Sequence, residues 1–575
     1  MIAGIDLGTT HSLAAVWRNG QAELIRNALG HVLTPSVVSL DEDGSILIGL
    51  AAGERLQSHP DRTAAVFKRA MGTSRTFRLG KREFRAEELS SFVLRSLKTD
   101  LETALGEPVA EVVVTVPAYF SQAQREATRQ AAALAGFERI SLLNEPTAAA
   151  LAYGLHQKDG ETQFLVFDLG GGTFDVSILE MFDGVMEVRA TAGDNQLGGE
   201  DVDQLIARHF IAESGLPANL ANQPTTKAQL VARVEAAKKE LSLAPSVQIR
   251  LPVSERTYEA ELTAEQLEEL VKPLMERMRT PVERAMRDAK LRPADLNAVV
   301  LAGGSTRMVS VRQWVTRMFG RFPETALNPD EVVALGAAVQ AGLKMNDAAL
   351  SERVMTDVCP YTLGIETSRE VSSGKHATGF MAPVMDRNTA IPASRVQQFS
   401  PVQDNQKILV IKIYQGEARR VNDNIMLGQF SVNLPSGLAR EVAVDVRFTY
   451  DISGLLEVGA TPLKNQQPAS PPVHVVVENT ANQLPAAEVA TRLLALQKLK
   501  IHPREQMETR TVMARAERLH SQLLGQLREQ LAAAITRFET VIESQDPRMI
   551  ESVKNHLVTF LDSLEADQFR LGDEQ

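Results

Sequence analysis

Short apolar runs alternate with stretches of helical period over roughly the first 345 residues, which predicts an α/β region. Residues 112–116 (Val-Val-Val-Thr-Val) have the composition of a buried strand. Ser121 with Gln124 is a capping-box pair that predicts a helix start, and Gly136 predicts the end of that helix. Further helices are expected over 201–212 and 227–241, and a strand over 247–251.

The periodicity fades across residues 347–358, where we place a linker between domains. Beyond it the period becomes two, as in an antiparallel sheet with one buried face. Strands are expected over 407–414, 441–450 and 473–477. In the second of these, alternate residues are expected to face the core: Val442, Val444, Val446, Phe448 and Tyr450.

Helix-forming residues dominate from about residue 485 to the end. Five residues at helical spacing predict one apolar face: Leu519, Leu523, Leu527, Leu531 and Ile535. Breaks are expected near Pro503 and Pro547. A helix packed on its own neighbours is favoured over a partner-binding or membrane-surface helix.

Composition excludes several classes of protein. The 575-residue chain has a formal net charge of −11, which disfavours a nucleic-acid partner. Its one cysteine, Cys359, rules out an internal disulfide framework, fits a reducing compartment and is expected to be a small buried residue. No leader precedes Ile2 and no apolar run reaches the roughly 18 residues of a membrane span, so we expect a cytoplasmic protein with no membrane partner.

Two turns of nearly the same sequence each follow an apolar run: Asp6-Leu7-Gly8-Thr9-Thr10 and Asp168-Leu169-Gly170-Gly171-Gly172-Thr173. Backbone N–H groups and threonine hydroxyls at such turns can bind phosphate, and the aspartates can hold a hydrated cation. A third turn, 303–306, lies at a strand-to-helix junction, which also favours anions. The Walker and dinucleotide glycine patterns are absent, so the three turns predict a nucleotide held from both sides by another kind of site.

Many separate segments then agree, in order, with one family. They are Gly4–Thr10, Lys68-Arg69-Ala70-Met71-Gly72, Val116-Pro117-Ala118-Tyr119-Phe120, Asn144-Glu145-Pro146-Thr147, Phe167–Ser177, Leu197-Gly198-Gly199-Glu200-Asp201, Gly303–Arg307, Asn328-Pro329-Asp330-Glu331, Leu363-Gly364-Ile365-Glu366-Thr367 and Gln415-Gly416-Glu417. The chain resembles the heat-shock protein 70 (DnaK-type) chaperones across nearly its whole length, and within them the HscC-like branch.

The resemblance implies a multidomain fold. An α/β actin-like (ribonuclease H-like) ATPase domain of two lobes would cover 1–346, followed by the linker at 347–358. An antiparallel β-sandwich that binds extended peptide would cover 359–484, and a short α-helical lid 485–575. It also implies ATP or ADP with Mg²⁺, admits K⁺, and implies client polypeptides and a J-domain co-chaperone as partners, with a nucleotide exchange factor as an optional one.

Nucleotide-site residues are carried over by matching motifs. Mg²⁺ would be held through water by Asp6 and Asp168. Catalytic roles would fall to Lys68, Glu145, Thr173 and Asp175, since hydrolysis of a phosphoanhydride needs neutralised charge and an aligned water. Nucleotide contacts would come from Thr9, Thr10, His11, Gly170, Gly171, Gly172, Gly198, Gly199, Glu235, Lys238, Lys239, Ser242, Gly303, Gly304, Ser305, Arg307 and Asp330. Glu235 and Lys239 could instead form an ordinary i,i+4 ion pair.

Peptide-groove positions are carried over in the same way: Ile365, Thr367, Ser368, Phe399, Val402, Gln406, Leu409 and Ile411. Such a groove takes the backbone hydrogen bonds of an extended peptide and one or more apolar side chains. From periodicity alone, Leu409 and Ile411 would be assigned to the sandwich core.

The linker departs from the family pattern, because Arg353-Val354-Met355-Thr356 replace a run of leucines before Asp357. Fewer apolar side chains predict weaker docking of the linker. The leading hypothesis is an ATP-dependent chaperone whose grip on apolar segments is switched by the nucleotide. The alternatives are a regulatory chaperone with few clients and weak coupling, a small-molecule kinase and an actin-like filament protein.

Overall fold

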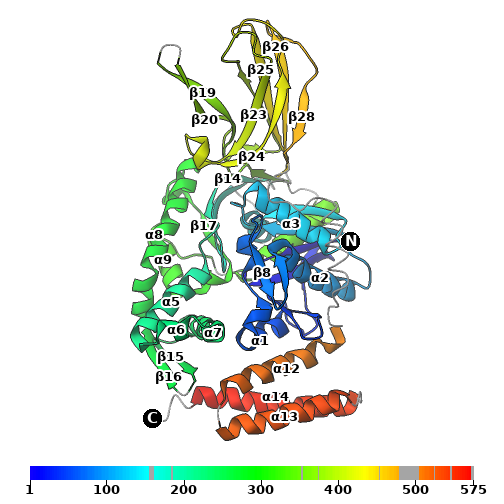
Figure 1. Cartoon of the computed structure of the whole chain (residues 1–575), viewed down its shortest axis with the longest axis vertical. Coiled ribbons are helices and arrows are strands. Elements are labelled where there is room, and N and C mark those ends of the chain that lie inside the picture. Colours follow the sequence, from blue (N-terminus) through cyan, green and yellow to red (C-terminus); the bar gives the residue numbers. More distant parts are fainter. Residues whose placement is uncertain are drawn as a thin grey trace.

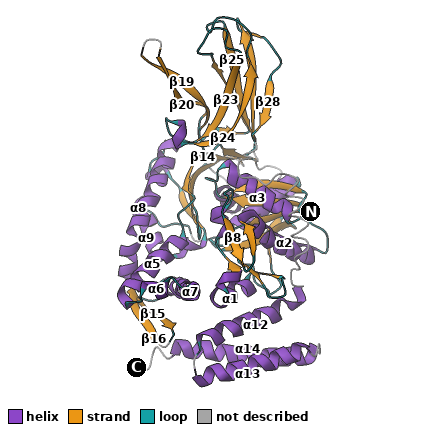
Figure 2. Ribbon diagram, viewed as in Figure 1, coloured by secondary structure: helices purple, strands orange, loops and turns teal. Residues whose placement is uncertain are grey.

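The computed structural model describes residues 1–154, 161–182, 185–254, 256–324, 326–350, 354–372, 375–451, 454–477, 504–523, 525–543 and 547–570. A two-lobed α/β body lies in the middle of the molecule, a β-rich body at one end and a helical body at the other (Figure 1). Figure 2 shows that the first end is built almost wholly of strands and the second of helices.

The first lobe is built on a mixed sheet with strand order β11-β10-β1-β2-β3. The strands β1, β10 and β11 are parallel, while β2 and β3 run antiparallel to their neighbours. Four valines of β10 are buried, as the apolar run predicts. The bounds are β1 Ile2–Asp6, β2 His11–Arg18, β3 Gln21–Ile25, β10 Glu111–Val116 and β11 Arg139–Asn144.

The second lobe repeats this topology. Its sheet has the order β17-β12-β13-β14, in which β12 pairs in parallel with β17 and the next two strands are antiparallel. In both lobes a glycine turn joins the first strand to its antiparallel neighbour, so the repeated sequence marks a repeated structure. The bounds are β12 Thr162–Leu169, β13 Phe174–Phe182, β14 Val185–Asp194 and β17 Ala298–Ala302.

Helices fill the space around the two sheets. The helices α4 (Glu145–Gly154) and α10 (Val332–Lys344) pack on one another within a shared core. The helix α3 (Gln122–Leu134) has the expected capping box, with Ser121 Oγ accepting from Gln124 N, and Gly136 follows it at positive φ. The other main elements are α1 Leu50–Ser58, α2 Ala86–Leu105, α5 Gly199–Ser214, α7 Pro224–Glu240, β15 Ser246–Val253, β16 Arg256–Thr263, α8 Ala264–Ala289 and α9 Val309–Phe319.

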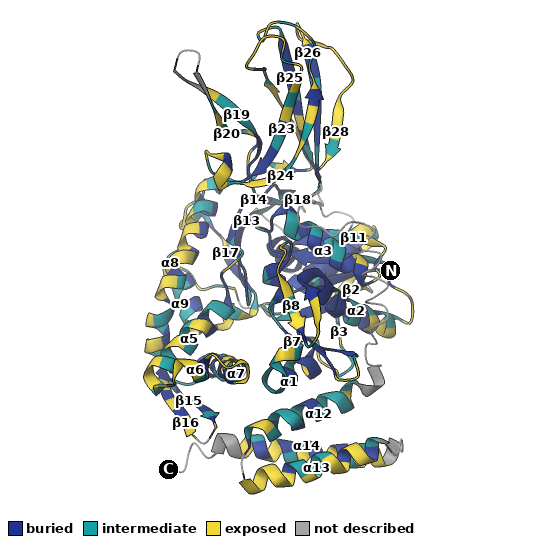
Figure 3. Cartoon of the chain, viewed as in Figure 1, coloured by how far each residue is buried: buried dark blue, intermediate teal, exposed yellow. Residues whose placement is uncertain are grey.

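The β-rich body has two sheets around one core, with orders β20-β19-β23-β24 and β22-β25-β26-β27. All five residues expected to face the core from residues 441–450 are buried, which confirms the period-two prediction (Figure 3). The bounds are β19 Leu363–Ser372, β20 Lys375–Met385, β22 Ala393–Phe399, β23 Ile408–Gln415, β24 Ile425–Asn433, β25 Val442–Tyr450, β26 Leu456–Lys464, β27 Gln467–Pro468 and β28 Val473–Val476.

Part of the expected linker forms a strand, β18 (Val354–Val358), that pairs in parallel with β14 and antiparallel with β21 (Ala390–Ile391). The Asp357 carboxylate accepts hydrogen bonds from Asn144 Nδ2 at 2.9 Å and Thr147 Oγ1 at 3.0 Å. The linker strand is therefore docked in this structure, although its sequence lacks the leucine run. Weaker docking than in better-known relatives stays a prediction about energy.

Three helices, α12 (Arg504–Gln522), α13 (Gly525–Glu543) and α14 (Pro547–Arg570), share a small apolar core of their own. The single apolar face predicted from Leu519 to Ile535 is wrong in one respect. The chain turns at Gly525, which has positive φ, so the face is divided between two helices. Leu531 is fully buried whereas Leu527 is 45 % exposed.

The helical body packs on the first lobe through α12 and α1. Arg518 forms an ion pair with Glu54, and Gln522 Nε2 donates to Gln57 Oε1 at 2.7 Å. The expected lid boundary at residue 485 and the break at Pro503 fall outside the described residues. Within the described residues, no helix is long and apolar enough to cross a membrane.

Candidate functional site

The two repeated turns face each other across the gap between the lobes. A Cβ built on Gly171 would lie 2.4 Å from Thr10 Cγ2, and one on Gly198 would lie 2.5 Å from the backbone of Gly171. No side chain fits at such distances, so glycine at 171 lets the two turns meet and glycine at 198 lets the segment 197–201 pack on the second turn. The expected pairing of the turns is thus present in the structure.

Between the turns lies a cavity of about 630 Å³. Its lining includes Asp6, Thr9, Thr10, His11, Lys68, Glu145, Asp168, Gly170, Gly171, Thr173, Gly199, Glu235, Lys238, Lys239, Ser242, Gly303, Gly304, Ser305, Arg307 and Asp330. Three of the residues expected in the nucleotide site, Gly172, Gly198 and Asp175, are not part of this lining. The two glycines support the turns, and Asp175 lies on β13 directly opposite Asp168 on β12.

The third turn completes one wall of the cavity. Ser305 Oγ donates to the Gly170 carbonyl at 2.8 Å, which ties this turn to the second one. Arg307 is held 2.7 Å from Asp330, so its guanidinium is fixed at the rim. Turns from three distant parts of the sequence therefore converge on one space.

Four carboxylates, three of them buried and that of Asp6 half-buried, lie near one buried lysine beside the cavity. Lys68 Nζ lies 2.6 Å from Glu145 Oε1, and both side chains are more than 90 % buried. The charges of Glu145 and Lys68 both affect the pKa values of three nearby aspartates, Asp6, Asp168 and Asp175. The negative charge in this cluster exceeds the positive charge, and burial makes such an excess costly.

Burial is the main cause of the raised pKa values of these aspartates. It raises the pKa of Asp6 to about 7 and that of Asp175 to about 8, and the charge of Glu145 adds to both shifts. The pKa of Asp168 is also raised well above its usual value by burial and by the neighbouring carboxylates. A cation beside these groups would favour their charged forms.

The donor set fits a hydrated Mg²⁺. Among the described residues, no three His, Cys, Asp or Glu side chains converge as ligands for a metal ion. Mg²⁺ characteristically keeps several waters and binds one or two carboxylates together with phosphate oxygens. Asp6 and Asp168, which both line the cavity, would supply that pair of carboxylates.

The helix α7 supplies charged residues to the cavity wall. Glu235 and Lys239 form the i,i+4 ion pair weighed above, at 2.7 Å, and both also line the cavity. Lys238 Nζ lies 2.8 Å from Asp203. Burial and the charge of Lys239 lower the pKa of His11, which favours a neutral ring in this cleft.

Sequence reasoning missed several residues of the cavity wall. Asp203 and Glu200 on α5 and the apolar Leu33 and Leu243 also line it. Leu243 is 94 % exposed, a rare state for a large apolar side chain, but nothing in its local sequence distinguishes it from a core leucine. Arg69, next to Lys68, pairs with Asp201 and donates to the Gly172 carbonyl, so it braces the second turn.

The expected peptide-groove positions all belong to the β-rich body but differ in burial. Ile365 and Ile411 are buried in its core, whereas Phe399 and Leu409 are partly buried against that core. Val402 is 48 % exposed. Thr367 and Ser368 lie on β19, and Gln406 lies in the connection between β22 and β23.

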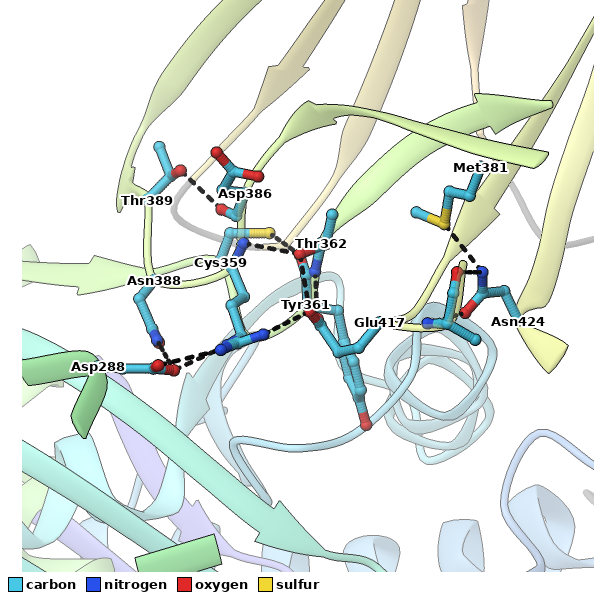
Figure 4. Close-up of polar contacts among 12 residues, drawn as sticks. Asp288, Cys359, Tyr361, Thr362, Met381, Asp386, Asn388, Thr389, Glu417 and Asn424 are labelled. Carbon is cyan, nitrogen blue, oxygen red and sulfur yellow. Dashed lines mark hydrogen bonds and ion pairs between the residues drawn. The ribbon is translucent and has the colours of Figure 1, made fainter. Parts of the chain in front are cut away.

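Figure 4 shows the contact between the β-rich body and the second lobe. Arg387 forms a bidentate ion pair with Asp288, at 2.7 and 3.0 Å, and also binds Glu417 at 2.6 Å. Asn388 Nδ2 donates to the same Asp288 at 2.9 Å. This contact fixes the position of the β-rich body on the α/β body.

A second contact connects the β-rich body with one of the carboxylates near Lys68. Tyr361 Oη donates to the Tyr119 carbonyl at 2.5 Å, and the two rings lie 4.3 Å apart. Tyr119 N in turn donates to Asp175 Oδ1 at 3.0 Å. The nearby Cys359 is buried, as expected, and burial raises the pKa of its thiol to about 12.

Comparison with known families gives one match that covers nearly the whole chain. The model of the family described as Hsp70 protein matches residues 2–78 and 74–572.

Proposed function

Because the chain belongs to the Hsp70 family, whose members are ATPases and chaperones, we propose that it hydrolyses ATP in the cleft and uses the cycle to bind and release extended apolar segments. ATP, Mg²⁺, client polypeptides and J-domain co-chaperones are general to the family. A nucleotide exchange factor and the assignment to the HscC-like branch are finer proposals for this chain.

In the proposed site, the two opposed turns supply backbone N–H groups and threonine hydroxyls to the phosphates. Lys68 supplies a fixed positive charge, held by its 2.6 Å contact with Glu145. Glu145, Thr173 and Asp175 would orient the attacking water and accept its proton, because phosphoryl transfer depends mainly on position and charge. Mg²⁺, near Asp6 and Asp168, would neutralise charge on the phosphates.

The coupling to peptide binding would pass through the contacts of the docked bodies. Tyr119 is hydrogen-bonded to Asp175 on one side and to Tyr361 on the other. The linker strand β18 extends the sheet of the second lobe. A change in the relative position of the lobes would therefore alter both contacts, which gives a physical route from the nucleotide to the β-rich body.

The observation that carries this proposal is a buried lysine near four carboxylates, three of them buried, beside two turns in contact. The test is ATP turnover of the wild type and Thr173→Ala, each with and without an extended apolar peptide. Thr173 lines the cavity and makes none of the contacts between bodies described above. We expect the peptide to stimulate the wild type and not the variant.

A control variant is Thr99→Ala, on the exposed face of α2, which should behave as the wild type. Failure of the wild type to bind adenine nucleotide at any magnesium concentration would refute the site. Turnover in the wild type that no apolar peptide changes would leave the ATPase standing and refute the coupling.

A further inference from the structure

Three arginines surround one aromatic ring on the hairpin β19–β20. The guanidinium carbons of Arg369, Arg419 and Arg420 lie 5.3, 5.4 and 3.9 Å from the centroid of Phe380. Phe380 is only 3 % exposed, yet it belongs to none of the apolar clusters of the described residues. We call these three residues, which cover the ring with charge, the arginine patch.

Hydrogen bonds hold the backbone that carries part of the arginine patch. Phe380 and Arg420 form an antiparallel bridge, and Met381 N donates to the Arg419 carbonyl. Asn424 ties down the same connection, because its amide contacts Ala418 and Arg420 backbone atoms and the Met381 sulfur (Figure 4). The backbone that carries Arg419 and Arg420 is thereby fixed to the edge of the hairpin.

The charge of the patch is not neutralised within the described part of the chain. All three arginines are exposed, and none of them forms an ion pair among the described residues, where Arg420 only donates weakly to the Thr378 carbonyl at 3.4 Å. Two acids of the same body are paired with other cations: Glu366 binds Lys412 and Glu417 binds Arg387. Three close guanidinium groups repel one another, and a bound anion would relieve that repulsion.

The distribution of charge along the sequence also favours an acidic partner for the β-rich body. Residues 359–477 contain eleven lysines and arginines against ten aspartates and glutamates, whereas the whole chain has a net charge of −11. The β-rich body is thus the slightly positive part of an acidic protein. An acidic partner would be repelled by the rest of the molecule and attracted here.

The patch lies beside the expected peptide groove. Thr367 pairs with Phe380 and Ile365 pairs with Ala382, so Phe380 lies on the same face of the sheet as these two groove positions. Arg369 follows the groove position Ser368 directly in β19. A peptide seated in the groove would bring its flanking residues to these arginines.

We propose that the arginine patch selects clients whose apolar segment is flanked by aspartate or glutamate. The inference rests on the proposed function, since it needs a peptide in the groove. Each exposed charge pair changes affinity only a few-fold. Arginine binds carboxylates with two parallel hydrogen bonds and so exceeds lysine in this role.

The alternative is that the aliphatic parts of the three arginine side chains serve only to cover Phe380. That role needs no anion and predicts no preference among peptides. It is distinguished from the proposal by peptides that differ only in the charge of their flanks.

The test measures dissociation constants of the full chain for three labelled peptides by fluorescence anisotropy. All three share a leucine core, and their flanks are aspartate, glutamine or lysine. We expect the aspartate-flanked peptide to bind about tenfold more tightly than the glutamine-flanked one, and the lysine-flanked one more weakly than both. The difference should shrink as salt rises from about 0.05 M to about 0.5 M.

The variant Arg369→Gln/Arg419→Gln/Arg420→Gln should bind all three peptides alike. Because it uncovers Phe380, the same triple change to lysine is the second variant, and it should keep part of the preference. The control Arg395→Gln/Arg440→Gln/Arg447→Gln removes the same charge from other exposed positions of the β-rich body and should keep the full preference.

Two results would overturn the inference while the proposed function stands. One is equal affinity of the wild type for all three peptides. The other is equal loss of preference in the control variant, which would point to net charge alone. If the glutamine-flanked peptide does not bind at all, the proposed function itself fails.

Discussion

The cleft between the lobes and the expected peptide-groove positions of the β-rich body differ in what holds their residues in place. In the cleft, backbone segments approach so closely that glycine is required, and charged groups are buried against one another. The expected groove positions include ordinary apolar residues whose exposed fraction ranges from 1 % at Ile411 to 48 % at Val402. Packing therefore constrains residue type far more tightly in the cleft than at the expected groove positions.

The strongest test of the cleft is the replacement of its buried cation. We expect Lys68→Ala to lower ATP turnover about a hundred- to a thousandfold, because the phosphoryl charge loses its fixed partner, while ATP affinity changes little. Single-turnover hydrolysis and equilibrium binding of ATP separate the two effects. The control is Lys272→Ala, at an exposed i,i+3 pair on α8. Turnover retained by the Lys68 variant would contradict the catalytic assignment.

The difference in burial across the groove gives the second test. We expect Ile411→Ala to destabilise the β-rich body by about 3 kcal/mol, since it opens a cavity in the core. Leu409→Ala should cost much less stability but weaken peptide binding, because Leu409 is only partly buried. Native-state hydrogen exchange of β23 and β24 reports the stability, and peptide anisotropy reports the binding. Equal destabilisation by both changes would place Leu409 in the core.

The contact of the two turns gives the third test. In Gly171→Ala the new Cβ would lie 2.4 Å from Thr10 Cγ2, so the turns must separate. We expect about a tenfold loss of ATP affinity, measured by calorimetry, because the phosphate donors are no longer aligned. The matched control is Gly53→Ala in α1, where the Cβ would meet nothing within 4 Å. Unchanged affinity in the Gly171 variant would show that the turns are not held together around the nucleotide.

Some features of the fold and the site could be predicted from the sequence, and others could not. The repeated turns were predicted because close backbone approach there leaves little but glycine that fits, and the strand at 441–450 because alternate side chains face the core. Leu243 and Tyr361 were missed, since a leucine or tyrosine carries no local sign of whether it covers a cleft or joins two bodies. The break at Gly525 was missed because the leucine spacing continues across it.

The contact between α12 and the first lobe is expected to give the smallest effect. Arg518 pairs with both Glu54 on α1 and Glu565 on α14, so Glu54→Gln removes the contact between bodies and leaves the one within the helical body. We expect a loss of about 0.5 kcal/mol of docking free energy, because ion pairs near the surface contribute little. Energy transfer between dyes on engineered cysteines in α1 and α13 measures the docked fraction, and the buried Cys359 should not react. The control is Glu23→Gln, which breaks the exposed pair with Arg18 in the same lobe. If the docked fraction falls equally in both variants, or in neither, the Arg518–Glu54 pair does not hold the helical body on the lobe, and apolar packing between α1 and α12 must do so instead.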